Sequence, residues 1–308
     1  MASEFKTPLF TIILSTYNRR DLLPRAIESI LVQSIPDFEL LVIDNGSIDD
    51  TRYVVRRMED SRIKYILNPC PTNTCDGARN LGIKLAKGTL ISFLDDDDIW
   101  YPDRMLKVKR AFEENPDVSA VCHYENRRIN NRVDGLLKHG PWTENFLEVL
   151  LYERNCLSSC GTTIKAGLLR DLGGFVLHEE FYMASDYDLW LRMAAKNIRF
   201  YFIEEPLGEF CVTGNNLSHV NPAIPYHVAC LIRKHIREFE KKHVFRISTR
   251  GLWRLFQLYS IAGRTFLNGR QYKFALMNYF RALSFLLLRP TLSLRLILNL
   301  SRKFRLSA

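Results

Sequence analysis

Short apolar runs alternate with amphipathic stretches along the first third of the chain. The runs are rich in Leu, Ile, Val and Phe, lack strict alternation with polar residues, and occupy residues 10–16, 38–44, 62–67 and 89–94. Runs of this kind predict strands that are covered on both faces. After the first run, Leu23, Ile27, Ile30 and Leu31 recur at helical spacing. This order of strand and helix predicts an α/β fold with a mostly parallel, Rossmann-like sheet and helices on both faces.

Turn and capping residues mark the ends of the predicted helices. Asp21 and Pro24 mark the start of the first helix, and Gly88 follows a third that covers residues 78–86. The candidate caps for the second helix are Ser47, Asp49 and Asp50. In open parallel sheets, ligands bind outside the carboxyl ends of the strands. The residues that follow each strand are therefore the first place to look for chemistry.

The pattern is less regular beyond residue 103. We expect helices at 103–114, 165–172 and 186–196, and strands at 118–125 and 198–203. After Pro225 the pattern is helical throughout.

This change of pattern predicts two parts. A first domain over residues 1–222 has two halves, at about 8–115 and at about 116–222. A basic helical region over residues 223–308 forms a C-terminal appendage.

Composition narrows the class of protein. The chain has 308 residues, of which 47% are hydrophobic, which suits a folded globular protein. The seven Cys form no C-x-x-C pair, so we expect reduced, mostly buried thiols. The first residues lack the features of a secretory signal, so we expect a cytoplasmic location.

The formal net charge of +9 favours an anionic partner, and the basic residues are concentrated in the C-terminal region. The most apolar stretch there is broken by Arg289, Pro290 and Arg295, so we expect no membrane span. The region can instead lie on the inner face of a membrane as a peripheral contact. The alternative is a helical cap whose apolar faces pack within the protein.

The first two strands end in polar groups. Ser15-Thr16-Tyr17-Asn18 follows the first strand, and it lacks the G-x-G-x-x-G that a dinucleotide fold needs. An ordinary nicotinamide enzyme is therefore disfavoured. The second strand ends at Asp44, whose carboxylate can accept hydrogen bonds from a base imide or a ribose hydroxyl. The alternative for Asp44 is a capped turn.

The fourth strand ends in four consecutive acids, Asp95 to Asp98. Adjacent carboxylates raise one another's pKa unless a cation offsets their charge. Mg²⁺ and Mn²⁺ prefer oxygen ligands and are usually held by one or two carboxylates together with substrate phosphates. The cluster therefore predicts a divalent metal site, with a solvated acidic loop as the alternative.

Several motifs in one order give a more specific indication than any one of them. From about Phe10 to His219 the sequence resembles family-2 glycosyltransferases of the GT-A fold, which are inverting enzymes with a D-x-D metal motif. The motifs that carry the resemblance are S-T-Y-N, V-I-D-N-G-S-x-D-D-T, G-A-R-N-L-G-I, F-L-D-D-D-D-x-W and S-D-Y-D-L-W-L-R. The C-terminal region lies outside it.

The resemblance implies a nucleotide-binding half at about 8–115 and an acceptor half at about 116–222. Ser15 and Tyr17 would surround the nucleobase, and Asp44 would contact the uracil or ribose. Arg79 would flank the base or phosphate, and Asp96 would bind the ribose. The alternative for Arg79 is an arginine on the surface of its helix.

The resemblance also implies the metal ligands and the base. Asp97 would hold the metal, and Asp95, the first acid of D-x-D, would reach it through water. Asp186 stands where the family has its catalytic base, usually preceded by Glu, but the preceding residue here is Ser185. The alternative for Asp186 is a helix cap. Asp188 would point away from the site.

His219 follows the last strand-like segment, where it could contact the diphosphate or the metal; a solvated loop histidine is the alternative. Together these residues predict a metal-dependent, inverting glycosyltransferase. It would move a sugar from a nucleotide-diphosphate sugar, with UDP favoured by the resemblance, to a hydroxyl of a glycan or lipid-linked saccharide.

Three other functions are less consistent with the sequence. A sugar nucleotidyltransferase would have a glycine-rich loop after the first strand, and residues 15–21 contain no glycine. A nucleic-acid-binding module would need one continuous basic face with stacking aromatics, so we expect no nucleic-acid partner. A non-catalytic nucleotide-sugar sensor would not need the retained carboxylates.

Overall fold

The computed structural model describes residues 7–213, 221–241 and 247–287. His219 and the basic residues from Arg289 onward therefore lie outside the described residues. The described chain forms two compact units. The first contains residues 7–146, 155–177 and 185–213, and the second contains residues 147–154, 178–184, 221–241 and 247–287.

A nine-stranded sheet is the centre of the first unit, with strand order β3-β2-β1-β4-β8-β6-β9-β5 and β7 paired to β6. The strands are β1 (Phe10–Thr16), β2 (Phe38–Asp44), β3 (Ile63–Leu67), β4 (Leu90–Asp95), β5 (Ile99–Trp100), β6 (Ala120–Ile129), β7 (Arg132–Leu137), β8 (Thr162–Lys165) and β9 (Phe200–Val212). Strands β3, β2, β1 and β4 are parallel, as the sequence predicted.

The other half of the sheet is mixed. β8 runs antiparallel to β4 and β6, and β7 and β5 are antiparallel to β6 and β9. Only β6 and β9 are parallel to each other there. The β6–β7 connection is a tight turn, and such a short connection permits only antiparallel pairing. The α/β class is confirmed, and the parallel order is limited to the half that was expected to bind the nucleotide.

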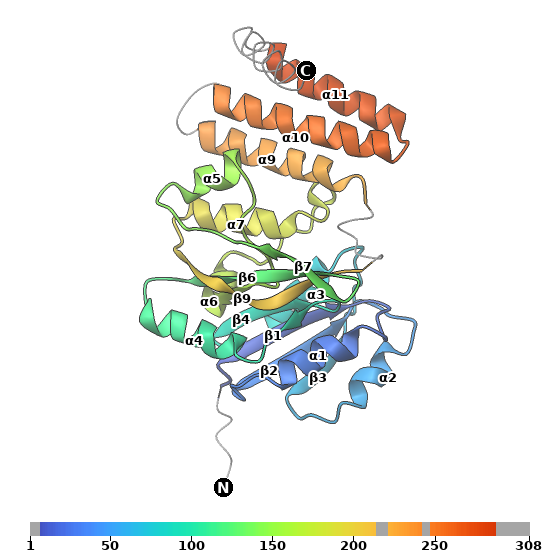
Figure 1. Cartoon of the computed structure of the whole chain (residues 1–308), viewed down its shortest axis with the longest axis vertical. Helices are drawn as coiled ribbons and strands as arrows, with labels where there is room; N and C mark the ends of the chain where they lie inside the picture. Colours follow the sequence, from blue (N-terminus) through green and yellow to red (C-terminus); the bar gives the residue numbers. More distant parts are fainter. Residues whose placement is uncertain (1–6, 214–220, 242–246, 288–308) are drawn as a thin grey trace. The chain divides into compact units, whose positions relative to one another are not determined.

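Helices cover the parallel strands on both faces (Figure 1). The helices of this unit are α1 (Leu23–Leu31), α2 (Thr51–Arg56), α3 (Asp76–Leu85), α4 (Arg104–Glu114), α6 (Ala166–Asp171) and α7 (Ser185–Ala195). Ile12 and Leu14 of β1 pack in one core cluster with Ile27 of α1 and Val108 of α4. Ile13, which points to the other face, lies against α3. Burial on both faces explains why β1 has no apolar–polar alternation.

Gly82 lets α3 approach β1 closely. A Cβ atom added at this position would lie 2.6 Å from Cγ2 of Ile13. We expect Gly82→Ala to lower the free energy of unfolding by about 1–2 kcal/mol, because the steric clash exceeds the helix propensity gained. Gly167→Ala in α6 is the control, since its Cβ would meet nothing within 4 Å, and it should stabilise the chain slightly. Urea titration of both variants measures the difference, and equal effects would contradict the packing argument.

A buried arginine fixes the segment that follows β4. Arg104 of α4 is fully buried, and its guanidinium lies 3.7 Å from the centre of the Trp100 ring. It donates hydrogen bonds to Nε2 of His123 at 3.1 Å and to Oγ1 of Thr163 at 2.9 Å. Burial lowers its pKa to about 9. Trp100 in turn donates from Nε1 to the carbonyl of Cys160 at 3.0 Å, so α4, β6 and β8 together hold the loop around the acidic run.

Several short elements were not predicted. Strands β5, β7 and β8 and helix α5 (Phe146–Tyr152) have two to seven residues each, too few to show a periodic pattern. The predicted strands at 118–125 and 198–203 extend further, to Ile129 and Val212. All seven cysteines are free, as expected, and five of them are buried.

The second unit is helical. Its elements are most of α5, the short helix η1 (Glu179–Phe181), α9 (Ile224–Lys241), α10 (Thr249–Asn268) and α11 (Tyr272–Leu287). Pro225 lies in the first turn of α9, where proline is tolerated. Buried Glu240 accepts hydrogen bonds from Tyr152 Oη at 2.8 Å and from Ser248 Oγ at 2.6 Å. The second unit therefore combines the C-terminal helices with residues 147–154 and 178–184 from the middle of the chain. No described helix has the length and apolarity to cross a bilayer.

Candidate functional site

Three of the predicted site residues meet at one edge of the sheet. In the register of the parallel strands, Ser15 of β1 is opposite Asp95 of β4, and Thr16 is opposite Asp44 of β2. These positions are the carboxyl ends of adjacent strands, where an α/β sheet binds its ligand. The strands thus bring together the groups that the sequence predicted at this edge.

Asp44 is buried, and both of its carboxylate oxygens have partners. Oδ1 accepts hydrogen bonds from the backbone N–H groups of Gly46 at 3.1 Å and Ser47 at 2.7 Å. Oδ2 accepts from the hydroxyl of Tyr65 at 2.6 Å, and burial raises the pKa of that phenol. The capped turn is therefore present, and a contact of Asp44 with a base or ribose stays a prediction.

Hydrogen bonds join the loop after β1 to the loop after β2. Asn18 accepts at Oδ1 from the backbone N–H of Ile48 at 2.8 Å, and its own N–H donates to Ser47 Oγ at 2.8 Å. Ser15, near the end of β1, is buried, whereas Tyr17 in the loop that follows is 54% exposed. A rigid loop with one exposed aromatic ring is suited to stacking against a flat base.

Arg79 points into the site and is not a surface residue. It is 6% exposed, and its Nη2 lies 2.6 Å from Oδ1 of Asp95. Its guanidinium also lies 5.4 Å from the centre of the Phe175 ring. Burial is the largest single effect and lowers the pKa of Arg79, but the charge of Asp95, together with Asp76 and two neighbouring thiols, raises it by more, so the net pKa is raised. The side chain therefore keeps a positive charge beside the acidic run.

The four acids form a turn in which the Asp98 N–H donates to the carbonyl of Asp95 at 3.1 Å. Asp96 is 9% exposed, with Nε of Arg19 at 3.8 Å from its Oδ1. Burial and the charge of Asp97 raise the pKa of Asp96 to about 7. Burial and Asp95 raise the pKa of Asp97 to about 6. In this turn, burial and the repulsion between carboxylates therefore outweigh the attraction of Arg19.

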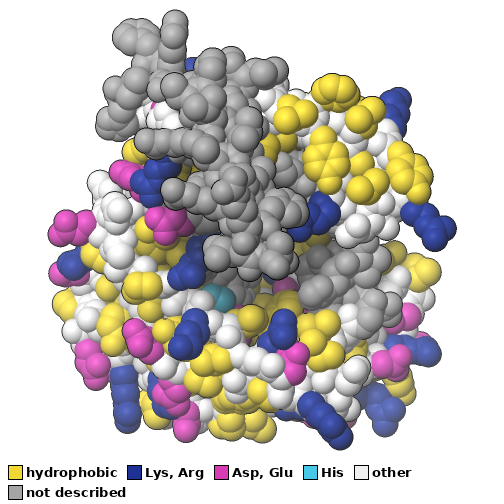
Figure 2. All heavy atoms as spheres, turned by 45° about the horizontal axis from the view of Figure 1, so that its top comes forward, with side chains coloured by type: hydrophobic (Ala, Val, Ile, Leu, Met, Phe, Trp, Pro, Cys, Tyr) yellow, Lys and Arg dark blue, Asp and Glu magenta, His cyan; other side chains and the backbone are white. Residues whose placement is uncertain are grey.

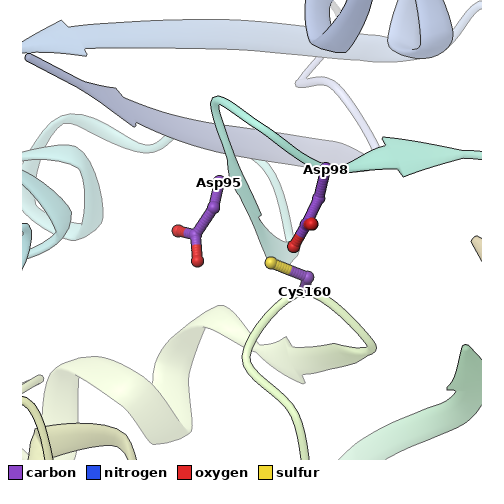
Figure 3. Close-up of side chains that lie close together, drawn as sticks. All are labelled: Asp95, Asp98 and Cys160. Atoms are coloured by element: carbon purple, nitrogen blue, oxygen red, sulfur yellow. The ribbon is translucent and has the colours of Figure 1, made fainter. Parts of the chain in front are cut away.

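Asp95, Asp98 and Cys160 form a group that could hold a metal ion (Figure 3). One ligand atom from each lies within 4.8 Å of the others. The carboxylates suit Mg²⁺ or Mn²⁺, whereas a thiol suits softer metals. Asp97 is not in this group among the described residues. The side chains present thus fit a hard divalent cation through carboxylates, with Asp98 as a candidate that the motif did not indicate.

Asp186 stands at the start of α7. Its Oδ1 accepts from the N–H of Tyr187 at 2.7 Å, and Ser159 Oγ donates to Oδ2 at 3.4 Å. Burial raises its pKa, although the charge of Arg79 opposes this shift. A carboxylate with a raised pKa is a stronger proton acceptor than an exposed one. The geometry is therefore compatible with the role of a base.

Ser185 and Asp188, on either side of Asp186, are structural. Ser185 Oγ donates to Oδ1 of Asp76 at 2.5 Å. Asp188 is fully buried and pairs with Nε of Arg192 at 2.6 Å. Asp188 is thus held in the interior by its own helix, which leaves Asp186 as the candidate base.

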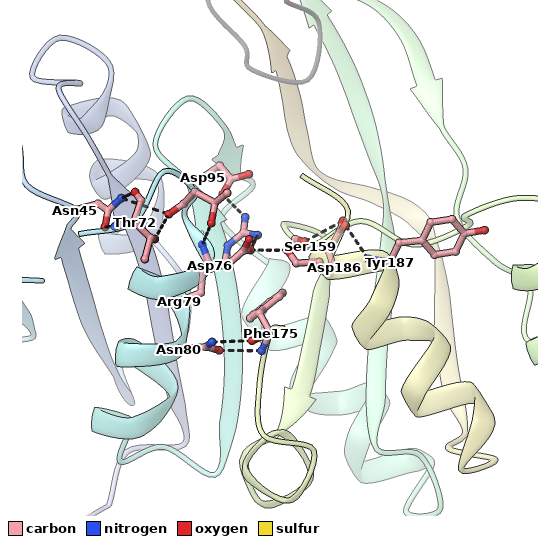
Figure 4. Close-up of polar contacts among 12 residues, drawn as sticks. Asn45, Thr72, Asp76, Arg79, Asn80, Asp95, Ser159, Phe175, Asp186 and Tyr187 are labelled. Atoms are coloured by element: carbon pink, nitrogen blue, oxygen red, sulfur yellow. Dashed lines mark hydrogen bonds and ion pairs between the residues drawn. The ribbon is translucent and has the colours of Figure 1, made fainter. Parts of the chain in front are cut away.

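A polar network joins the two ends of the site (Figure 4). Asp95 contacts Arg79, Arg79 Nη1 lies 4.0 Å from Asp76, and Asp76 accepts from Ser185 beside Asp186. The sequence analysis missed Asp76, although its i,i+3 spacing from Arg79 on one helix was a usable signal. It also missed Asn80, which holds the backbone N–H and carbonyl of Phe175 at 2.8 Å each, and no local pattern indicates that contact.

Comparisons with known proteins agree with this arrangement. Residues 11–173 match the family described as "Glycosyl transferase family 2". A similar protein in Escherichia coli, "UDP-Glc:alpha-D-GlcNAc-diphosphoundecaprenol beta-1,3-glucosyltransferase WfgD", is 33% identical over 193 residues, which cover 61% of this chain and 71% of that protein.

Two solved structures share the fold. S. aureus TarS 1-349 in complex with UDP-GlcNAc has a TM-score of 0.64 at 20% identity, covering 89% of this chain and 81% of that one. The mannosyltransferase PcManGT of Pyrobaculum calidifontis, in complex with GDP-Man and Mn²⁺, has a TM-score of 0.56 at 18% identity, covering 97% and 81%. With the family match over more than half of the sequence, they lead to one conclusion: the chain belongs to glycosyltransferase family 2 and is a glycosyltransferase with a GT-A fold.

Proposed function

We propose that the protein is an inverting, metal-dependent glycosyltransferase that uses a UDP-sugar and a lipid-linked saccharide or related glycan as acceptor. One observation carries the proposal. The acidic turn at Asp95 is joined through Arg79 and Asp76 to Ser185, the residue before Asp186 and far away in the sequence. The charge of Arg79 also acts on the carboxylate of Asp186. A single displacement at an anomeric carbon requires a site for the leaving group on one side and a proton acceptor on the other. The network has one of these groups at each end.

We assign donor binding to the edge of the parallel strands. Tyr17 would stack on the base, with Ser15 and Asp44 beside it. Asp96 would accept a hydrogen bond from the ribose, and Arg79 would offset phosphate charge. Support for UDP comes from the Escherichia coli relative, whose name gives UDP-Glc as its donor.

Asp186 would take the proton from the acceptor hydroxyl as that oxygen attacks the anomeric carbon. The bond to the donor diphosphate breaks on the opposite face, so the configuration inverts without a covalent intermediate. Asp95, Asp97 and Asp98 are the residues that would hold Mg²⁺ or Mn²⁺. Such an ion, when bound, offsets the charge that develops on the leaving diphosphate.

The lipid-linked acceptor is supported by the name of the Escherichia coli relative, which acts on a diphosphoundecaprenol-linked GlcNAc. The charge of this chain agrees with work at an anionic membrane. After Glu240 the sequence has 14 Lys and Arg and no Asp or Glu, whereas the preceding 240 residues have 29 Lys and Arg against 34 Asp and Glu. We therefore propose that the helical region makes a peripheral contact with the inner face of a membrane.

A charge-matched experiment tests this contact. Arg264, Arg270 and Lys273 are exposed in the helical unit, and replacing all three by Gln should weaken binding to anionic vesicles by about 100-fold, at roughly 1 kcal/mol each. The control replaces three exposed arginines of the first unit, Arg52, Arg56 and Arg57. Sedimentation with vesicles at low and high salt measures both. Equal loss in the two triple variants would contradict a specific role for the helical region.

The activity itself is tested by a screen of nucleotide sugars. We expect a UDP-sugar with Mn²⁺ to raise the melting temperature and to be hydrolysed slowly without acceptor. Binding without turnover on any acceptor would indicate a sensor. Release of pyrophosphate from UTP and a sugar 1-phosphate would indicate a nucleotidyltransferase. Either result would overturn the proposal.

A further inference from the structure

A cavity of about 280 Å³ lies inside the helical unit. Residues of α9, α10, α11 and the adjoining loops line it, among them Tyr226, Phe266, Phe274, Met277, Asn278 and Arg281. Phe266 and Asn278 are buried in its wall, whereas Phe274 and Met277 are 50% and 39% exposed at its rim. An apolar cavity of about 150 Å³ is enough to bind benzene, so this one can take a longer hydrocarbon segment.

The polar side chains of the lining differ in what they can offer a ligand. Asn278 is 1% exposed, and its Nδ2 donates to the carbonyl of Phe274 at 2.8 Å. Its Oδ1 is sealed within the packing of the helices, so a molecule in the cavity does not reach it. Arg281 adds a positive charge, with its guanidinium 5.2 Å from the centre of the Tyr226 ring.

The apolar rim continues onto the outer face of α11. Tyr272, Leu276, Phe280 and Leu283 follow one another at helical spacing and are 51–65% exposed. Figure 2 shows hydrophobic side chains gathered in the upper right of the view, with Lys and Arg at their margin. Both α10 and α11 are free of Asp and Glu. An apolar surface on helices that carry basic and no acidic residues matches a lipid that carries an anionic group.

We propose that this cavity binds the hydrocarbon chain of a phosphorylated lipid. The chain lies against Phe266, Phe274 and Met277, and the phosphate faces Arg281. The inference rests on the proposed function, because the lipid-linked acceptor of that reaction has both groups. It adds a second point of attachment for the acceptor, in the helical unit.

Soluble probes test the cavity without a membrane. Geranyl phosphate and octyl phosphate, below their micelle concentrations, should bind the full chain saturably in calorimetric titrations, whereas inorganic phosphate should not. Tighter binding of geranyl phosphate identifies an isoprenoid carrier, and tighter binding of octyl phosphate identifies an acyl lipid. No saturable binding of either, or equal binding of inorganic phosphate, would overturn the proposal.

Matched variants test whether the probe binds in the cavity. Phe274→Glu puts a carboxylate at the rim and should weaken binding by about tenfold or more. Phe280→Glu makes the same change on the same helix, outside the cavity lining, and should change affinity less than about twofold. Met277→Glu is the second rim variant, in case Phe274→Glu does not fold. Equal weakening by rim and control variants would overturn the assignment.

A separate readout keeps this inference distinct from the proposed function. Hydrolysis of the UDP-sugar by the wild-type chain does not involve the cavity and should be unchanged in the rim variants, while transfer to a lipid-linked acceptor should show a raised KM. If wild-type transfer to such an acceptor is normal and the rim variants match it, the cavity assignment is wrong and the proposed function stands. If wild-type transfer is absent while the probes bind, the proposed function is wrong.

Discussion

Replacing Asp186 by Asn should lower the turnover number by roughly 10²-fold or more, with little change in the affinity for the donor. The amide keeps the shape of the side chain and can still accept from the N–H of Tyr187, but it cannot take a proton. Steady-state kinetics at saturating donor, with donor affinity from calorimetry, separates the two quantities. If affinity collapses while turnover survives, Asp186 binds substrate and is not the base.

Asp188→Asn is the matched control, two residues further along the same helix. Asp188 is fully buried in an ion pair with Arg192, so breaking it should lower the free energy of unfolding by about 3 kcal/mol. Turnover per folded molecule should stay near that of the wild type. If folded Asp188→Asn protein loses as much turnover as Asp186→Asn, the loss reflects disturbance of α7 and does not identify Asp186 as the base.

The pH dependence adds an independent test. The base must be deprotonated, so the rate should fall on the acidic side as Asp186 takes up a proton. Because burial raises its pKa, that fall should begin at a higher pH than an ordinary aspartate would give. In Asp186→Asn the part of the acidic limb that belongs to this carboxyl should be lost, and only the part that reflects Asp96 and Asp97 should remain.

The parallel half of the fold was predictable from the sequence, because strands buried on both faces give unbroken apolar runs. The same runs fixed where Ser15, Asp44 and Asp95 would meet, since the carboxyl ends of parallel strands lie at one edge. The remaining strands were missed where they are short. Strand β8 has four residues and is recognisable only through its pairing with β4 and β6.

The contacts that complete the site depend on tertiary structure and have no local signal. The bond from Ser185 to Asp76 joins residues that no spacing rule connects. Cys160 lies near Asp95 and Asp98 because Arg104 and Trp100 hold its loop there. Sequence periodicity predicts which face of an element is buried, but it does not predict which loops meet.

Removing the metal ion or one of its ligands should lower the rate of transfer strongly. Loss of the charge offset on the leaving diphosphate is worth several kcal/mol, so excess EDTA, or Asp97→Ala, should lower turnover by about 10²–10³-fold and weaken Mn²⁺-dependent binding of UDP. The fold should persist, because the acidic turn lies at a strand end.

Asp95→Asn and Asp98→Asn identify the direct ligands, since a ligand variant should need more Mn²⁺ for half-maximal activity. Asp103→Ala, an exposed acid in the same segment, is the control. Full activity of the wild type in EDTA would contradict the metal site, and an unchanged Mn²⁺ requirement in Asp97→Ala would assign the ion to Asp95 and Asp98.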